Sequence, residues 1–305
     1  MLPLDAEFCA VLASRVQRGG RYALIDYPDY NNPGDAAIWL GTRKMLGDMA
    51  GGPPAYVSSL KRFDAAACIG KVGDGTVFLL GGGNFGSLYA RHHARRLAAI
   101  AALHGNRVVQ LPFSLAGVDA AVIEDTRRVV RAHPDLTLIA RDNATLAKAE
   151  ALLGTGLLLA PDPAHALALT APCPTKAEAR LLRKDRESTG RLDATGQRLD
   201  SFDWADIGRL RALNRLGKLA LMLALPSARL AVMDLTARAK VTAAVNCLAT
   251  GERVVTDRLH GMILAQMIGR DVVVHDNATG KVAAYLETWG ASLGSVSIAA
   301  AERAA

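Results

Sequence analysis

The chain is 305 residues long, half of it apolar and 21% of it charged, so we expect two compact domains and no extensive disorder. Its formal net charge of +7 favours acidic partners, such as phosphorylated metabolites or anionic membrane surfaces. Aromatic residues make up only 5% of the chain and do not alternate with basic residues, which argues against nucleic acid as a partner.

The first half of the chain alternates short apolar runs with longer amphipathic stretches. This alternation predicts an α/β fold in which parallel strands are covered by helices on both faces. In such a sheet, ligands bind beyond the carboxyl ends of the strands. Strands are expected at residues 22–26, 76–80, 107–111 and 136–140, and helices at residues 36–49, 89–104 and 120–132.

The second half repeats this pattern after an irregular connection. Pro161 and Pro163 end a short apolar run at residues 157–160, and the passage between the two domains is placed here. The charged stretch at residues 179–206 is interpreted as a solvated loop. Further strands are expected at residues 220–225, 230–233, 253–256 and 271–275, and helices at residues 237–248, 258–268 and 281–289.

Neither a metal site nor a targeting segment is expected. The four cysteines lie far apart, and no cluster of His or carboxylate residues has ligand spacing. The first ten residues carry two acids and lack the basic start and apolar core of a signal peptide. We therefore expect reduced thiols and a cytoplasmic location.

The segment from Asn31 to Asp35 follows the first expected strand and opens the first expected helix. Asp35 is a good N-cap for this helix. Alternatively, Asn31 and Asp35 bind hydroxyl groups, or Asp35 acts as a base. Both interpretations stay open on the sequence.

A glycine-rich segment at residues 81–86 matches G-x-G-x-x-G, the pattern of dinucleotide-binding turns. Two features disfavour a dinucleotide. The segment does not follow the first strand, and the next strand ends in residues 110–112 without the acid that would bind a ribose. We therefore expect Gly82, Gly83 and Asn84 to form a loop that brings the backbone close to an anion or a sugar.

Arg141 stands between another expected strand and the next helix, where Asp142 is positioned to cap that helix. Its guanidinium is a candidate anion ligand at the strand ends. The alternative is an ion pair with Asp142 or another surface acid. Arg183 and His165, each just after an apolar run, are second-rank candidates, and Arg183 has the alternative of a solvated charge cluster.

The strongest local signal is the segment at residues 256–261, where an acid, an arginine and an imidazole stand at a strand-to-helix junction. The free N–H groups of a helix start favour an anion, and Arg258 can bind a phosphate or carboxylate through two hydrogen bonds. His260 either relays protons beside that anion or packs in the core against Leu264. Asp257 is expected to cap the helix, with a role as a base as the alternative.

Asn277 and Lys281 follow the last expected strand, so they also belong to the carboxyl-end edge of the second half. Lys281 is a candidate phosphate ligand, or it is an ordinary lysine in the first turn of a helix. Because the helix dipole disfavours a cation at that place, a compensating anion is favoured.

Eight motifs resemble, in content and order, those of the polysaccharide pyruvyltransferase family: NNPGDAAI, GGGNFG, QLPFSL, ARDNAT, PDPA, LLRKD, TDRLHGMILAQMIG and VHDNATGKVAAYLETW. The resemblance spans residues 22–289. It implies two Rossmann-like lobes similar to the glycosyltransferase B-type fold, with the active site in the cleft between them. Residues 1–157 are expected to form an N-terminal domain on the acceptor side, and residues 158–305 a C-terminal domain on the donor side.

The resemblance also implies phosphoenolpyruvate as co-substrate, no resident cofactor, and a pyruvate ketal on a sugar as product. The Arg-Leu-His motif of the family maps onto Arg258, Leu259 and His260, where it is associated with donor binding. The arginine that the family places after the interdomain strand maps onto Arg183, with Arg141 as the alternative.

The mechanism implied by these residues begins with protonation of the donor's methylene carbon. One sugar hydroxyl then adds, and a second displaces phosphate. His260 is the expected acid and base, with Asp35 and Asp257 as reserve bases. The residues assigned to the donor are Arg258, Leu259, Arg183, Arg141, Lys281 and Asn277.

The acceptor implied by the family is an exopolysaccharide or its lipid-linked oligosaccharide precursor. Such an enzyme is expected to work at the inner face of the plasma membrane, with Arg127, Arg128 and Arg131, or residues 183–191, touching anionic lipid. The alternatives are a nucleotide-sugar-dependent glycosyltransferase of the same fold type and a non-catalytic binding protein for sugars or membrane surfaces. The sequence leaves open the acceptor sugar, the bridged hydroxyl pair, the ketal stereochemistry and the oligomeric state.

Overall fold

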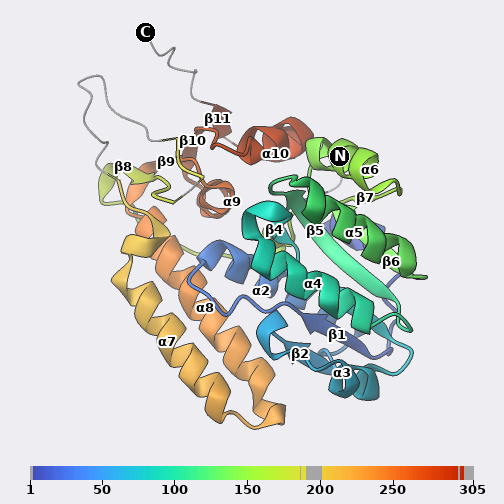
Figure 1. The fold of residues 1–305 in the computed structure, drawn as a ribbon. Helices are drawn as coiled ribbons and strands as arrows, with labels where there is room; N and C mark the ends of the chain where they lie inside the picture. The colour runs from blue at the N-terminus through green and yellow to red at the C-terminus, as the bar shows by residue number, and fades with distance from the viewer. Residues whose placement is uncertain (1–2, 186, 190–200, 295, 299–305) are drawn as a thin grey trace.

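The computed structural model describes residues 3–185, 187–189, 201–294 and 296–298, and Figure 1 shows its fold. The chain forms an α/β fold with two parallel sheets, one from each half of the sequence. The predicted alternation of parallel strands and helices is therefore confirmed. Among the described residues, no helix is both long and apolar enough to cross a membrane.

The first sheet has the strand order β2-β1-β3-β5-β6-β7, with β4 paired to β5. The chain leaves β1 on one side to form β2 and returns to its other side to form β3. This reversal opens a crevice at the carboxyl ends of β1 and β3, where ligands of such sheets bind. The strands are β1 (Tyr22–Ile25), β2 (Tyr56–Ser58), β3 (Thr76–Leu79), β4 (Gly82–Phe85), β5 (Val108–Leu115), β6 (Leu136–Ala140) and β7 (Leu158–Leu159).

Helices cover both faces of this sheet because successive strand residues point to opposite sides. Leu24 and Phe78 pack in one apolar cluster with α1 and α2, whereas Ala23 and Ile25 pack in another with α3 and α4. The helices of this half are α1 (Leu4–Leu12), α2 (Pro33–Ala50), α3 (Ala65–Val72), α4 (Ala90–Ala102), α5 (Ala120–Ala132) and α6 (Asn143–Leu153).

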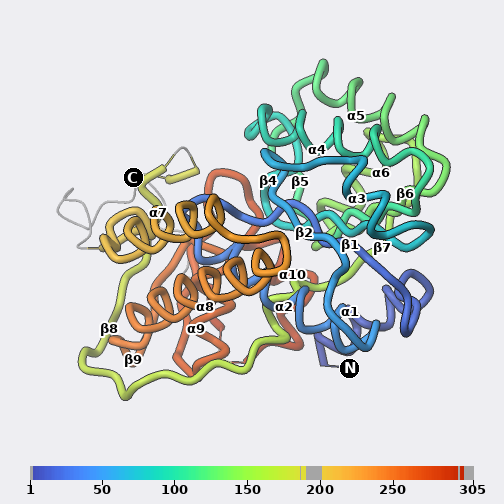
Figure 2. Tube along the Cα trace, turned by 90° about the horizontal axis from the view of Figure 1, so that it is seen from below, coloured from blue at the N-terminus to red at the C-terminus, as the bar shows by residue number. Residues whose placement is uncertain are grey.

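The second sheet has the order β11-β10-β9-β8, again all parallel. Helix α2 of the first half packs against α8 of the second, and α7 and α8 lie side by side as a hairpin (Figures 1 and 2). The elements are β8 (Lys176–Leu181), α7 (Gly208–Leu223), α8 (Arg229–Leu248), β9 (Gly251–Thr256), α9 (Leu259–Met267), β10 (Asp271–Val274), α10 (Lys281–Trp289) and β11 (Val296–Ile298).

Two predicted strands of the second half are wrong, because residues 220–225 and 230–233 lie mostly in α7 and α8. Residues 220–225 are all Ala, Leu or Met, and none has a β-branched side chain. This composition favours a helix. Leu210, Gly217 and Leu221 form the buried face of α7 at helical spacing.

Two predicted loops also differ from the structure. Residues 82–85 form the short strand β4 and not a loop. Residues 176–181 form β8, and the stretch after it is not simply a solvated loop, because Arg183 and Asp203 are both buried. The remaining part of that charged stretch, residues 186 and 190–200, lies outside the described residues.

Candidate functional site

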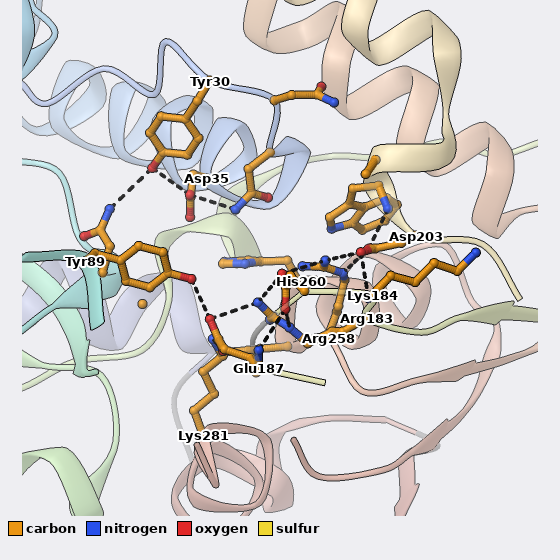
Figure 3. Close-up of a pocket in the computed structure, with 18 of the residues that line it drawn as sticks. Tyr30, Asp35, Tyr89, Arg183, Lys184, Glu187, Asp203, Arg258, His260 and Lys281 are labelled. Carbon is orange, nitrogen blue, oxygen red and sulfur yellow. Dashed lines mark hydrogen bonds and ion pairs between the residues drawn. The ribbon is translucent and has the colours of Figure 1, made fainter. Parts of the chain in front are cut away.

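A cavity of about 460 Å³ lies at the carboxyl ends of strands from both sheets, and Figure 3 shows the side chains around it. The first half contributes the segment after β1, the strand β4 and the residue that follows β6. The second half contributes the segments after β8 and β9 and the first residue of α10. The lining residues include Tyr30, Asn31, Asn32, Asp35, Gly83, Asn84, Tyr89, His92, Arg141, Arg183, Asp185, Glu187, Asp203, Arg258, Leu259, His260 and Lys281.

A polar cluster from the first half surrounds Asp35. Its Oδ2 accepts hydrogen bonds from the Tyr30 hydroxyl and from Asn32 Nδ2, both at 2.8 Å. Burial and the neighbouring Asp35 raise the pKa of Tyr30 well above its usual value, so Tyr30 keeps its proton and donates it. Asn32, and not Asp35, is the N-cap of α2, which removes the simple capping interpretation of Asp35. Among the described residues, hydrogen bonds to Asp35 reach only its Oδ2, so the Oδ1 of Asp35 is left for a ligand.

A second layer of buried charge supports this cluster. Asp26 accepts hydrogen bonds from Arg96 at 3.0 Å and His92 at 3.1 Å, and Arg96 also binds the side-chain oxygen of Asn84 at 2.5 Å. Asn84 in turn donates to Tyr30 at 3.3 Å. Asp26 has a φ of +71°, an uncommon conformation for a non-glycine residue that concentrates at functional sites.

The opposite wall contains the start of α9. Arg258 occupies the N-cap position, and no side chain caps this helix. Leu259 and His260, in its first turn, both line the cavity. Uncapped N–H groups and the positive end of the helix dipole make this a favourable place for an anion.

His260 is held by a fully buried carboxylate. Its Nε2 lies 3.1 Å from Asp162 Oδ2, and a Cβ added to Gly34 of α2 would lie only 2.6 Å from its Nδ1. Glycine is therefore required where α2 passes the imidazole. Burial opposes charge on Asp162, but His260 and Arg141 outweigh it and hold the Asp162 pKa below its usual value. With Nε2 bound to a carboxylate, Nδ1 is the nitrogen left for proton exchange.

Arg258 is engaged by acids in this structure. Its Nε and Nη2 bind the two oxygens of the buried Asp203 at 2.5 and 2.7 Å, in a bidentate pair. The same Nη2 lies 3.2 Å from Asp185 Oδ2. Arg258 is thus fixed in orientation before any ligand binds.

Asp185 bridges two guanidinium groups. Arg183 binds it through Nε and Nη2, each at 2.9 Å, while Arg258 reaches it from the other side. Burial opposes charge on Asp185, yet the hydrogen bond and the charge of Arg183, with Arg258, lower its pKa to about 2. This carboxylate lies at the point where the two arginines converge, and its side chain is 41% exposed to solvent.

Arg141 and Lys281 are two further cations on the cavity wall. Arg141 binds Asp162 at 2.8 Å and Ser114 Oγ at 3.1 and 2.9 Å. Lys281 contacts Glu187, which also accepts a hydrogen bond from Tyr89. Burial lowers the pKa of Lys281 to about 8 despite the charge of Glu187.

Several residues assigned to the site from the sequence line the cavity and others do not. Asp257 does not cap α9, since its Oδ1 accepts the Arg183 backbone N–H at 2.9 Å. The buried Asn277 donates to the Asp257 carbonyl and is structural. His165 is half-buried and stacks on Tyr285, with its Nε2 3.0 Å from the Tyr285 hydroxyl. The assigned residues on the cavity wall are Asn31, Asp35, Gly83, Asn84, Arg141, Arg183, Arg258, Leu259, His260 and Lys281, and those outside it are Gly82, Asp257, Asn277 and His165.

Sequence reasoning missed the acids that partner the cations. Asp162 stands between two prolines after a strand. This position allows an N-cap to be predicted, and Asp162 does cap the following turn, but it does not reveal the contact with His260. Asp203 and Glu187 lie in the stretch interpreted as solvated. In the described residues, no group of three or more His, Cys, Asp or Glu side chains could hold a metal ion.

The site therefore places the buried carboxylate of Asp35 in one cavity with the imidazole of His260 and two converging arginines. The arginines and the start of α9 can hold an anion. His260 and Asp35 can give and take protons at a molecule bound in this cavity.

Comparison with known proteins identifies the family. The family model described as polysaccharide pyruvyl transferase matches residues 32–274, most of the chain. This chain belongs to the polysaccharide pyruvyl transferase family. The resemblance found in the sequence motifs is confirmed, and the chain is a transferase of a family that acts in pyruvyl transfer to polysaccharide.

Individual relatives agree with this family. Pyruvyl transferase 1 of Schizosaccharomyces pombe is 27% identical over 293 residues, which cover 91% of this chain and 72% of that protein. A Bacillus subtilis (strain 168) protein named "Putative pyruvyl transferase EpsO" is 29% identical over 279 residues, which cover 87% and 84%. The crystal structure of an uncharacterized Klebsiella pneumoniae protein has a TM-score of 0.63 at 19% identity, covering 99% and 100%, and this shows similarity of fold.

The match to the polysaccharide pyruvyl transferase family covers most of the cavity wall. The matched range, 32–274, includes Asp35, Arg141, Arg258 and His260, and it ends before Lys281. Asp35 and Asn32 of the first half and the α9 start of the second are therefore within the matched region, whereas Tyr30 lies just before it.

Proposed function

We propose that this polysaccharide pyruvyl transferase uses phosphoenolpyruvate as donor, forms a pyruvate ketal on a sugar and releases phosphate. The observation that supports this most is the convergence of Arg183 and Arg258 on one point beside His260 and the start of α9. Phosphoenolpyruvate carries a carboxylate and a phosphate, and it needs cations for both and a proton donor for its methylene carbon.

The donor is proposed to replace the carboxylate of Asp185 between the two arginines. Asp185 is the partly exposed acid of the group, whereas Asp203 is buried and keeps Arg258 in place. One anionic group of phosphoenolpyruvate takes the Asp185 position. The other lies toward Arg141 and Lys281, whose Nη2 and Nζ come within 3.6 and 3.4 Å of the position that a Cβ on Gly83 would occupy.

His260 is proposed to protonate the donor. Nδ1 of the imidazolium gives its proton to the methylene carbon, the double bond is consumed, and the carbon that carries phosphate becomes electrophilic. Asp162 positions the ring by accepting a hydrogen bond from Nε2. Asp257 lies outside the cavity wall and is not needed as a base.

Asp35 is proposed to serve the acceptor. Its free Oδ1 takes the proton from the first sugar hydroxyl as that oxygen bonds to the electrophilic carbon. A second hydroxyl of the same sugar then displaces phosphate. Its proton passes to the now neutral His260 as the C–O bond to phosphate breaks, and the departing phosphate takes up the proton held by Asp35. Asn31 and Asn84 are placed to bind sugar hydroxyls, because they line the cavity on the side of Asp35.

In this scheme, residues 1–157 bind the acceptor and residues 158–305 bind the donor, each forming a Rossmann-like lobe with the cavity between them. The acceptor is a polysaccharide or its lipid-linked oligosaccharide precursor on the cytoplasmic side. Phosphoenolpyruvate is a co-substrate, and the reaction needs no resident cofactor.

Incubation with phosphoenolpyruvate and a panel of glycosides tests the proposed function. The expected result is phosphate release that depends on the glycoside, with a matching gain in glycoside mass. Nucleotide sugars in place of phosphoenolpyruvate are the control. Sugar transfer with release of a nucleoside diphosphate would instead identify a glycosyltransferase and overturn the proposal.

The pH dependence of kcat/KM for the donor is expected to reveal Lys281. Because its pKa is about 8, its ammonium is present at lower pH and is lost as pH rises through 8. Donor kcat/KM is therefore expected to fall across that range. In Lys281→Arg, whose charge persists, the fall should disappear.

Lys240 is the internal control for this experiment. Its pKa is also about 8 because of burial, and it donates to the Tyr30 carbonyl at 2.9 Å. A fall that is unchanged in Lys281→Arg would assign the titration to Lys240 and remove Lys281 from donor binding.

A further inference from the structure

A second cavity, of about 280 Å³, lies away from the first, where the hairpin of α7 and α8 meets the loops after β1 and β2. Tyr27 and Asp29 form one wall, on the same loop whose Tyr30 lines the first cavity. The other lining residues are Val57, Ser58, Ser59, Lys61, Arg62, Lys218, Leu221, Met222, Arg229 and Met233.

Two buried hydroxyls in this cavity are unsatisfied. Ser58 is 5% exposed and Ser59 is 4% exposed. Within the described part of the chain, neither Oγ has a hydrogen-bond partner. A buried polar group without a partner costs free energy, so two such groups in one cavity point to a ligand that supplies acceptors.

The charge around these hydroxyls is positive. Lys61 lies 3.3 Å from Asp29, the acid of this cavity, and Arg62 Nη1 donates to the Leu221 carbonyl at 3.4 Å. Lys218 and Arg229 are exposed at the rim and make no ion pair with another described residue. Hydroxyl donors beneath several cations form a ligand set suited to a phosphate group.

An apolar surface adjoins this cavity. Leu216, Leu219, Met222 and Leu223 share the outer side of α7, and Leu225 follows in the turn to α8. Each is between 54% and 78% exposed. Met222 belongs to both the surface and the cavity wall.

The charges of α7 complement an anionic surface. Arg209, Arg211, Arg215 and Lys218 are exposed on α7, and this helix contains no acid. A helix with exposed leucines flanked by cations is typical of segments that lie in the headgroup region of a membrane. Figures 1 and 2 show that α7 lies on the outside of the hairpin, where a flat surface can reach it.

We propose that the α7–α8 hairpin docks on an anionic phospholipid surface, with one lipid phosphate in the cavity of Ser58 and Ser59. The outer leucines of α7 enter the acyl boundary, and Lys218 and Arg229 contact headgroup phosphates. This places membrane contact at a site different from both alternatives predicted from the sequence, the arginines of α5 and residues 183–191. Arg127 and Arg128 pair with Glu124 and Asp125 of their own helix.

Sedimentation with lipid vesicles tests the docking surface independently of the proposed function, because it needs neither donor nor acceptor. The protein is expected to sediment with vesicles that contain phosphatidylglycerol and not with phosphatidylcholine alone. Raised salt should release it. Lys218→Ala/Arg229→Ala is expected to weaken binding by roughly tenfold or more, given the contribution of each basic residue near an anionic surface.

Separate variants test the exposed leucines of α7 and the two serine hydroxyls of the cavity. Leu219→Gln/Leu223→Gln is expected to reduce vesicle binding, and Ser58→Ala/Ser59→Ala to reduce it at equal unfolding temperature. Arg128→Ala/Arg131→Ala is the matched control, since it removes two exposed cations elsewhere and should bind as the parent does.

Three outcomes would overturn the proposal. Vesicle binding that the control abolishes and the hairpin variants retain would place the contact elsewhere. Titration with inorganic phosphate that shows binding lost in Ser58→Ala/Ser59→Ala, without vesicle binding, would assign the cavity to a soluble phosphate compound. A dimer that Leu219→Gln/Leu223→Gln dissociates, again without vesicle binding, would assign the apolar face to a second copy of this chain.

Discussion

Replacing His260 with alanine is expected to lower kcat with phosphoenolpyruvate by about 10²–10⁴, the usual contribution of a positioned acid or base. The KM for the donor should change little, because the arginines that bind the anion remain. The physical reason is that His260 Nδ1 is the proposed proton donor to phosphoenolpyruvate, while Nε2 is engaged by Asp162. Steady-state kinetics at saturating acceptor measures both constants.

Two companion variants separate catalysis from structure. Asp162→Asn should also lower kcat, and its effect should not add to that of His260→Ala, because both act through one ring. His165→Gln is the matched control, since His165 stacks on Tyr285 and does not line the cavity. Near-normal turnover in His260→Ala would remove His260 from the mechanism.

Replacing Arg258 with alanine is expected to have two separable effects. It leaves Asp203, whose side chain is 3% exposed, without its bidentate partner, and breaking a buried pair from one side costs about 3–5 kcal/mol of unfolding free energy. It also removes one of the two guanidiniums that converge on Asp185, so the KM for phosphoenolpyruvate should rise. Denaturant unfolding and donor kinetics report the two effects.

The double variant Arg258→Ala/Asp203→Asn distinguishes them. Removing the orphaned charge should restore much of the unfolding free energy, while the KM for the donor stays high. If the donor KM returned to normal along with stability, Arg258 would be a structural residue and the proposed anion site would lie elsewhere.

Most of the fold was predictable because its signals are local. The helix at 120–132 and the strand at 136–140 agree with the predicted ranges, since apolar periodicity and flanking turns define both. The strands expected at 220–225 and 230–233 were wrong, because these apolar runs belong to the helices α7 and α8. A short apolar run does not by itself separate a strand from a helix. In the structure Leu221 and Met233 pack in the core, whereas Met222 and Leu223 are exposed.

The cations of the site were predictable and their partners were not. Arg258, His260 and Arg141 stand at strand-to-helix junctions, where the sequence pattern points to ligands. The partner acids were not predictable because they contact residues far away in the sequence. Asp162, for example, binds His260, which lies 98 residues further along the chain. A local sequence pattern does not show which distant residues come into contact.

The burial of charge in the second half has the same origin. Arg183 was given the alternative of a solvated cluster because acids and bases stand close together in the sequence there. In the structure these opposite charges neutralise one another, and this pairing allows Arg183 to be buried at the cavity wall.

The most direct test of pyruvyl transfer follows the carbon of phosphoenolpyruvate that carries the phosphate. With that carbon isotopically labelled and a glycoside acceptor present, nuclear magnetic resonance is expected to show the label in a quaternary carbon bonded to two sugar oxygens, with one phosphate released for each. Label that appears only as the carbonyl of free pyruvate, with the glycoside unchanged, would contradict ketal transfer by this chain.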